Sequence, residues 1–207
     1  RSARKGKISV LVGGKYENMR HRRNFLINLR KEDPEIRTHN MDKKEFVLKA
    51  VADKKALIVD VSDKIFDYAE VGFHEFKTAK LYEEVLKKEG FQVEMGVGGM
   101  PTAFKAVYGS GKPVIGFLAE YDALPELSQE GGCTMRKKAE GENPDGHGCG
   151  HNLLGTGSVA AAIAVKEYLE KNGKEGTVIF FGCPGEEGGS GKSFMARDGV
   201  FDNLGFA

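Results

Sequence analysis

The densest group of potential metal ligands lies in the segment 146–152, which reads GHGCGHN. Cys149 and His151 are two residues apart, so an extended backbone would turn both side chains to the same side. A thiolate and an imidazole together suit zinc and other first-row divalent ions. A helix expected directly afterwards would lower the pKa of Cys149 through its N-terminal dipole. The alternative is a buried free cysteine in a glycine-rich turn, which is the commoner meaning of an isolated Cys-x-His pair.

A second group consists of two adjacent carboxylates, Glu186 and Glu187, in the segment 182–189, which reads GCPGEEGG. It follows an apolar run typical of a buried strand, and α/β enzymes place their sites at the carboxyl ends of such strands. Neighbouring carboxylates repel each other unless a cation neutralises them. A metal ion would do so and would leave one carboxylate free to handle protons. The alternative is a solvated acidic turn.

Glu120 and Asp122 form a third, weaker group, again at the end of an apolar run (113–119). Acidic residues at a strand end are common, so alone they indicate little. Their value depends on whether the fold brings them to the other two groups.

The segment 188–193, GGSGKS, superficially resembles a phosphate-binding loop. The pattern Gly-x-x-x-x-Gly-Lys-Ser/Thr requires glycine at position 186, where this chain has glutamate. Glu186 and Glu187 would also repel phosphates. Nucleotide binding is therefore not expected.

The elements that would position these groups alternate between helix and strand. Apolar spacing predicts helices over 46–68, 76–89 and 153–169, with a further helix beginning near 193, and strands over 91–95, 102–108, 113–119 and 177–181. The polar, glycine-rich residues 128–148 predict a long loop, and such loops are usually functional. This order predicts an α/β sandwich with a mixed, largely parallel central sheet flanked by helices.

Composition limits the class of protein. Of the 207 residues 40% are hydrophobic and 29% charged, as in a soluble globular domain. No apolar run is long enough for a membrane span, and no secretory signal or disulfide framework is evident, so we expect a cytoplasmic protein. Residues 1–40 hold 11 Lys or Arg against 4 Asp or Glu. This basic leader could bind an acidic partner, but we expect it to be an appended segment, with the domain starting at Met41.

The three groups, in this order, resemble the dinuclear-metal aminoacylase/carboxypeptidase superfamily. The similarity is greatest to its amidohydrolase branch, which includes aminobenzoyl-glutamate hydrolases and related dipeptidases. It covers about residues 43–207 and depends on GFLAEYDALPELSQ (116–129), GHGCGHNLLG (146–155) and FFGCPGEEGG (180–189).

The resemblance implies a role for each candidate residue. Cys149 and His151 match the Cys-Gly-His metal ligands of the family, and Glu187 matches its ligand glutamate. Glu186 matches the general base, which takes a proton from the attacking water and passes it to the leaving amine. Asp122 would orient groups from outside the ligand shell. The family implies two divalent ions per complete site, zinc or manganese.

The sequence also departs from the superfamily's classical metallopeptidases, which have His-x-Asp where this chain has Glu120-Tyr121-Asp122. The Cys-Gly-His branch lacks that histidine too, so position 120 is not expected to be a ligand. Further histidine ligands, and a lid domain that mediates homodimerisation, would lie beyond residue 207. We therefore expect residues 41–207 to be the N-terminal part of the catalytic domain.

The resemblance implies metal-dependent hydrolysis of an amide in a small N-acyl or aminobenzoyl amino acid or dipeptide, without nucleic-acid or membrane partners. This fragment alone is expected to bind metal weakly. One alternative is a catalytically inactive α/β interaction or metal-binding protein, which would show no metal-dependent activity. Another is a redox or metal-storage role for Cys149.

Overall fold

The computed structural model describes the backbone of residues 34–206 and the side chains of residues 43–206. The chain divides into two compact units, Arg1–Asp42 and Lys43–Ala207, and the site concerns only the second. The expectation that the basic leader is an appended segment falls mainly on residues 1–33, which lie outside the described residues.

Two helices occupy the stretch for which apolar spacing predicts one over 46–68. Helix α2 (Pro34–Asp53) and helix α3 (Lys55–Tyr68) meet at Lys54, whose backbone leaves the helical range (φ −94°, ψ 6°). The Lys54 ammonium is 2.6 Å from a carboxylate oxygen of Glu89. The break is invisible in the apolar pattern, because that pattern continues across it.

Helices α4 (Phe76–Lys88) and α5 (His151–Lys171) agree with the predicted positions. Gly90, which follows α4, has the positive φ of +90° expected of a glycine at a helix end. Helix α5 begins two residues earlier than predicted, so His151 is its first residue.

The sheet contains four described strands in the order β1-β2-β4-β3: β1 (Gln92–Met95), β2 (Phe104–Ser110), β4 (Gly176–Gly182) and β3 (Val114–Ala119). The predicted α/β class with a mixed sheet is confirmed. The expectation of a largely parallel sheet is wrong for these strands, because only β3 and β4 pair parallel. Short connections join β1 to β2 and β2 to β3, so the chain reverses direction at each, and β2 runs opposite to β3 and therefore to β4, which is parallel to β3. Helix α5 lies in the crossover from β3 to β4.

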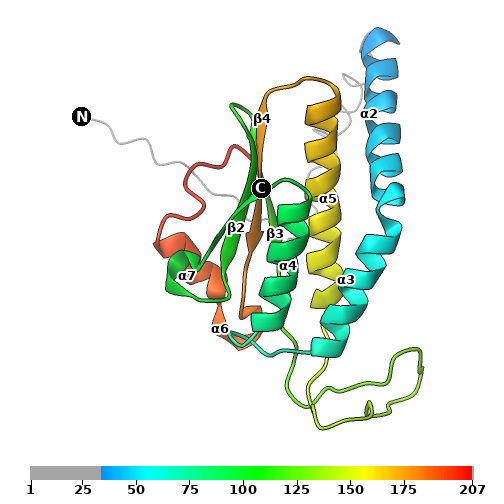
Figure 1. The fold of residues 1–207 in the computed structure, drawn as a ribbon, viewed down its shortest axis with the longest axis vertical. Helices are drawn as coiled ribbons and strands as arrows, with labels where there is room; N and C mark the ends of the chain where they lie inside the picture. The colour runs from blue at the N-terminus through cyan, green and yellow to red at the C-terminus, as the bar shows by residue number, and fades with distance from the viewer. Residues whose placement is uncertain (1–33, 207) are drawn as a thin grey trace, which may run out of the picture. The chain divides into compact units, whose positions relative to one another are not determined.

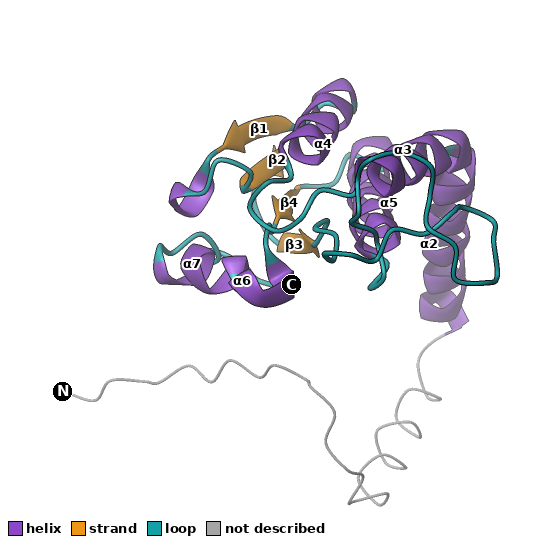
Figure 2. Cartoon of the chain, turned by 90° about the horizontal axis from the view of Figure 1, so that it is seen from below, coloured by secondary structure: helices purple, strands orange, loops and turns teal. Residues whose placement is uncertain are grey.

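Helices cover both faces of the sheet (Figures 1 and 2). Side chains of α3, α4 and α5 pack with Val178 and Phe180 of β4 in the larger core. The alternate residues Ile179 and Phe181 pack on the other side with Met195 of α7 (Gly191–Arg197) and with the segment after it. Neighbouring residues of one strand therefore support two layers.

Strand β3 is less buried than its apolar sequence predicts. A continuous apolar run is typical of a strand covered on both faces, yet only Gly116 and Ala119 of its residues are buried. Among the described strands β3 lies at one end of the sheet, which accounts for its partial exposure.

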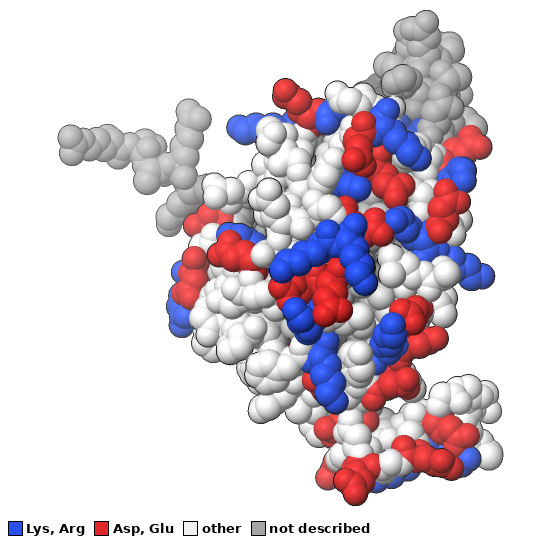
Figure 3. Space-filling model, in the orientation of Figure 1, with Lys and Arg blue, Asp and Glu red and all other residues white. Residues whose placement is uncertain are grey.

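Charged side chains are interspersed on the face of the molecule drawn in Figure 3. On α4, Glu83 contacts the ammonium groups of Lys80 and Lys87 at 2.9 and 2.7 Å. This mixture differs from the one-signed stripe typical of nucleic-acid-binding proteins. None of the helices in residues 34–206 combines the length and apolar character that a bilayer span requires.

Candidate metal and catalytic site

The three groups of candidate residues meet at the carboxyl ends of β3 and β4. The last residues of these strands, Ala119 and Gly182, pair with each other, so the segments that follow them leave the sheet side by side. One carries Glu120 and Asp122, and the other carries Glu186 and Glu187 in the short helical turn α6 (Glu186–Gly189). Helix α5 packs on both strands and brings His151 to the same edge.

His151 is held by Asp122, and both side chains are almost completely buried (2% and 1% exposed). The Nδ1 atom of His151 is 3.0 Å from Oδ1 of Asp122 and 3.1 Å from the Asp122 carbonyl oxygen. Both oxygens can only accept a hydrogen bond, so Nδ1 is the donor, and Nε2 is the ring nitrogen that faces the other side chains of the site. A carboxylate that fixes the tautomer in this way is the usual support for a metal-binding histidine.

The Nε2 atom of His151 faces three carboxylates. It lies 3.2 Å from Glu120 Oε2, 3.8 Å from Glu186 Oε2 and 3.9 Å from Glu187 Oε1. An imidazole nitrogen and several carboxylate oxygens around one small space favour a shared cation or proton between them. This is the electrostatic arrangement that a divalent ion would satisfy.

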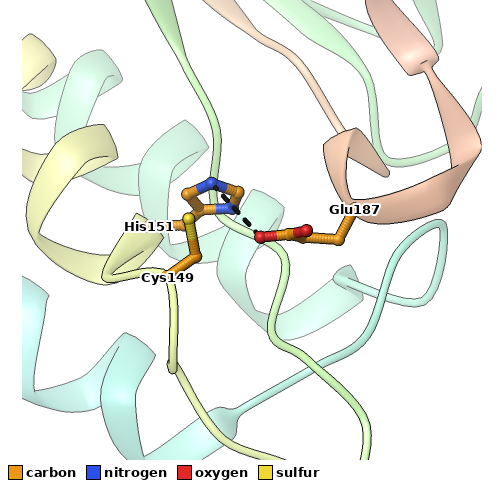
Figure 4. Close-up of side chains that lie close together, drawn as sticks. All are labelled: Cys149, His151 and Glu187. Carbon is orange, nitrogen blue, oxygen red and sulfur yellow. Dashed lines mark ion pairs between the residues drawn. The ribbon is translucent and has the colours of Figure 1, made fainter.

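Cys149, His151 and Glu187 form a compact set of possible ligands (Figure 4). Their sulfur, nitrogen and oxygen atoms all lie within 4.8 Å of one another. In the figure the three side chains point toward a common space: His151 comes from the first residue of α5, Cys149 from the segment just before that helix, and Glu187 from α6 on the opposite side. The structure thus brings together the residues that the sequence analysis selected as ligands.

The pKa of Cys149 is shifted in the opposite direction to that expected from the helix dipole. The pKa of this exposed thiol is raised, chiefly by its hydrogen bond to Glu187, then by burial and by the charges of Glu187, Glu186 and Glu120. Nearby anions outweigh the dipole, because they disfavour a further negative charge. A thiolate at this position therefore needs a compensating cation.

Glu120 and Lys192 add a contact that the sequence analysis did not predict. Glu120, His151 and Glu186 form a second group of possible ligand atoms within 4.8 Å. Position 120 was not expected to be a ligand, and here Glu120 is ion-paired with Lys192 of α7. The ammonium group partly neutralises Glu120 without needing a metal. Only the lysine in GGSGKS could have signalled this contact, and a lysine in a loop is a weak signal.

His147 does not join these ligand groups. Its Nε2 is 3.0 Å from the carbonyl oxygen of Ile65, so that atom carries the proton. Burial is the main cause of its lowered pKa. This contact joins the segment before α5 to α3.

The donor set fits a divalent metal. One sulfur, one imidazole nitrogen with a fixed tautomer and several carboxylate oxygens converge, which matches the ligands that zinc takes in proteins. A cavity of about 300 Å³ lies alongside Glu187 and is lined in part by Val71, Phe73, Ala123 and Pro125. The site thus combines candidate metal ligands with an adjacent, mostly apolar space.

Comparison with known proteins agrees with this geometry. Residues 116–206, which contain all the candidate residues, match the family described as Peptidase family M20/M25/M40. The chain is also 52% identical over 160 residues to one of the subunits of p-aminobenzoyl-glutamate hydrolase from Escherichia coli K12, covering 77% of this chain and 33% of that protein. Residues 116–206 are thus similar in sequence to the peptidase M20 family.

Solved structures support the same fold. A putative aminohydrolase from methicillin-resistant Staphylococcus aureus matches with a TM-score of 0.64 and 26% identity, covering 77% of this chain and 40% of that one. The YXEP protein of Bacillus subtilis, titled a dinuclear metal binding peptidase from the M20 family, matches with a TM-score of 0.57 and 22% identity, over 78% and 42% of the two chains. The chain thus spans about a third of the E. coli relative's length and about two fifths of these structures.

Proposed function

We propose that this chain belongs to a metal-dependent hydrolase that cleaves an amide bond in a small N-acyl or aminobenzoyl amino acid or dipeptide. The observation that carries the proposal is the convergence of Cys149, His151 and Glu187 within 4.8 Å, next to the free carboxylate of Glu186. The E. coli relative is named as a subunit of a hydrolase of p-aminobenzoyl-glutamate, which contains such an amide.

In this proposal the residues of the site have three separate roles: metal binding, orientation of a ligand and proton transfer. Cys149, His151 and Glu187 hold divalent metal, and Asp122 fixes His151 through Nδ1. When bound, the metal supplies Lewis-acid polarisation of the scissile carbonyl and lowers the pKa of the attacking water. Glu186, whose side chain is 41% exposed, accepts the proton of the water and then donates it to the leaving amine.

The cavity next to Glu187 offers a place for the uncharged part of the substrate. It is lined by Val71, Phe73, Ala123 and Pro125 together with glycines and Glu187. An acyl or aryl group seated there would place its amide carbonyl next to the metal ligands. Apolar lining with a few polar groups is typical of small-molecule sites.

The remaining features of the proposal concern the ions, the domain and the location. Two ions, zinc or manganese, would complete the site, and the thiol ligand favours zinc. Residues 41–207 would be the N-terminal part of the catalytic domain, and a lid domain outside them would mediate a homodimer. All three cysteines are free, which fits a reducing, cytoplasmic location.

Activity of the full-length protein toward p-aminobenzoyl-glutamate tests the proposal. We expect metal-dependent hydrolysis that is lost on chelation and restored by zinc or manganese. Glu186→Gln should lower kcat by about 10²- to 10⁴-fold while bound metal stays constant, because the proposal assigns Glu186 to proton transfer and the holding of metal to Cys149, His151 and Glu187. Glu130→Gln, in the long loop, is the matched control and should leave kcat unchanged.

Two outcomes would refute the proposal. One is hydrolysis that continues undiminished in Glu186→Gln. The other is a full-length protein that carries metal but cleaves none of a panel of N-acyl amino acids and dipeptides. The second result would favour the alternative of an inactive metal-binding protein.

A further inference from the structure

Glu75 is a completely buried carboxylate that the proposed reaction does not use. It lies directly before α4 and is 0% exposed. Its Oε1 accepts a hydrogen bond of 2.8 Å from the backbone N–H of Gly185, and its Oε2 accepts one of 3.0 Å from the hydroxyl of Thr102. No ion pair involving Glu75 is found among the described side chains.

The hydrogen bond between Glu75 and Gly185 lies next to the proposed catalytic residue, because Gly185 directly precedes Glu186. On the other side of Glu186, the backbone N–H of Glu187 donates a 2.8 Å hydrogen bond to Oδ2 of Asp122. The two N–H groups that flank Glu186 are therefore each held by a different buried carboxylate. Charge-assisted hydrogen bonds of this kind are short and directional, so they fix the backbone on both sides of Glu186.

Packing reinforces the hydrogen bond to Glu75. Gly185 has a φ of +59°, and a Cβ atom built there would lie 2.7 Å from the ring of Phe73. A Cβ at Gly189 would lie 2.3 Å from the same ring. Phe73 itself has a positive φ of +63°, which is unfavourable for an aromatic residue unless its surroundings compensate. The turn that carries Phe73 and Glu75 is thus in close contact with the loop that carries Glu186.

The same turn also contacts the loop after β3. The carbonyl oxygen of Glu70 accepts a 2.8 Å hydrogen bond from the N–H of Ala123, next to Asp122. The side chain of Glu70 accepts hydrogen bonds from the N–H groups of Lys77 and Thr78 in the first turn of α4. Residues 70–75 are therefore anchored to α4 and contact both loops of the site.

We infer that residues 70–75 form a brace for the site, and that Glu75 is a positioning residue which holds Gly185 and thereby the backbone of Glu186 and Glu187. The role of Glu75 in catalysis rests on the proposed function, but its hydrogen bond to Gly185 can be tested without any catalytic activity. It predicts that losing the Glu75 carboxylate loosens the 183–191 loop selectively.

Hydrogen–deuterium exchange of the full-length protein tests this link without any substrate. In Glu75→Ala the amides of residues 183–191 should exchange at least tenfold faster than in wild type, while those of β4 stay within twofold. Glu75→Gln keeps a carbonyl oxygen for the Gly185 N–H and an amide group that can donate to Thr102, so it should restore most of the protection. Val61→Ala is the control: it removes buried side-chain volume in α3, away from the loop.

Three results would overturn the inference. The 183–191 amides could exchange in Glu75→Ala within twofold of wild type. The exchange of these amides in Glu75→Ala could be no faster than in a Val61→Ala protein whose melting temperature has fallen by the same amount. Glu75→Gln could exchange as fast as Glu75→Ala, which would exclude the hydrogen bond as the cause.

Zinc titration then separates this inference from the proposed function. If wild type binds zinc, Glu75→Ala should bind it at least tenfold more weakly and Glu75→Gln should recover most of the affinity. Wild-type affinity in Glu75→Ala would refute the positioning role alone. Selective loosening of the loop in a protein that binds no metal would refute the proposed function and leave the brace intact.

Discussion

Two loop regions of the molecule are held in different ways. The strand-end segments at 120–123 and 183–191 are fixed by partners distant in sequence, such as Glu75 for Gly185 and Asp122 for His151. The long loop at 128–148, which protrudes in Figure 1, is held partly by its own residues. There the side chain of Gln129 donates to the carbonyl oxygens of Cys133 and Met135 and accepts from the N–H of Lys137.

This difference indicates where the chemistry depends on the fold. A metal site needs ligands held to within a fraction of an ångström, and buried, long-range contacts provide that precision. A loop held by its own hydrogen bonds can shift as a unit without disturbing the rest. Substitutions should therefore alter the site strongly at the strand ends and weakly in the long loop.

Asp122→Ala should have the largest effect. It removes the carboxylate that accepts from the buried Nδ1 of His151 and from the partly buried N–H of Glu187, and it leaves Nδ1 only the backbone carbonyl oxygen of residue 122. Hydrogen bonds to a charged group contribute about 1.5–3 kcal/mol each, so we expect the free energy of unfolding to fall by about 2–5 kcal/mol. Loss of such a supporting group should also lower metal affinity by about 10- to 100-fold. Urea denaturation and zinc titration measure the two effects, and a loss below about 1 kcal/mol would contradict them.

A pair of glycine substitutions compares the two regions directly. Gly185 and Gly132 both have positive φ, +59° and +72°, but a Cβ would meet the Phe73 ring only at Gly185 and open space at Gly132. Gly132→Ala should cost about 1–2 kcal/mol, from the left-handed conformation alone. Gly185→Ala should lower the free energy of unfolding by about 1–3 kcal/mol more than Gly132→Ala, because the added Cβ atom would overlap the Phe73 ring. Thermal or urea unfolding measures both variants, and an equal loss of stability in the two would show that the Phe73 ring can move aside at little cost.

The pH dependence of stability should reveal Glu75. Burial raises its pKa above the ordinary value of 4.5. The folded state then binds a proton that the unfolded state has released, so stability falls as the pH rises from 4.5 to the raised pKa and is level above it. Glu75→Gln lacks this titration, so the stability of wild type minus that of Glu75→Gln should decrease across that window. Urea denaturation from pH 4 to 8 measures it, and a difference that increases with pH would refute the assignment.

Gln129→Ala should have the smallest effect. It removes hydrogen bonds within a largely exposed loop, where water can replace the lost partners. We expect a stability change below about 1 kcal/mol and unchanged zinc affinity. A tenfold loss of affinity in Gln129→Ala would mean that the long loop also positions the ligands.

Much of the fold and the candidate ligands could be predicted from the sequence. Cys149, His151 and Glu187 belong to short motifs rich in glycine, and the strand ahead of each acidic motif is apolar, so their meeting at one edge followed from α/β topology. Their roles as ligands and base remain predictions.

The supporting residues could not be predicted in the same way. Glu75 lies in the amphipathic pattern before a helix and has the appearance of an ordinary surface carboxylate. Its burial depends on Gly185, 110 residues away, and no local pattern encodes that contact. The raised pKa of Cys149 was missed for the same reason, because the carboxylates that cause it come from other segments.

Bound metal is the most direct test of the account. Elemental analysis of the full-length protein would compare wild type with Cys149→Ala, Glu187→Ala and the control Cys133→Ala, which removes a cysteine of the long loop. The account predicts zinc or manganese in wild type and in Cys133→Ala, and clearly less in the other two variants. Wild-type protein without metal, or metal content unaffected by Cys149→Ala and Glu187→Ala, would contradict it.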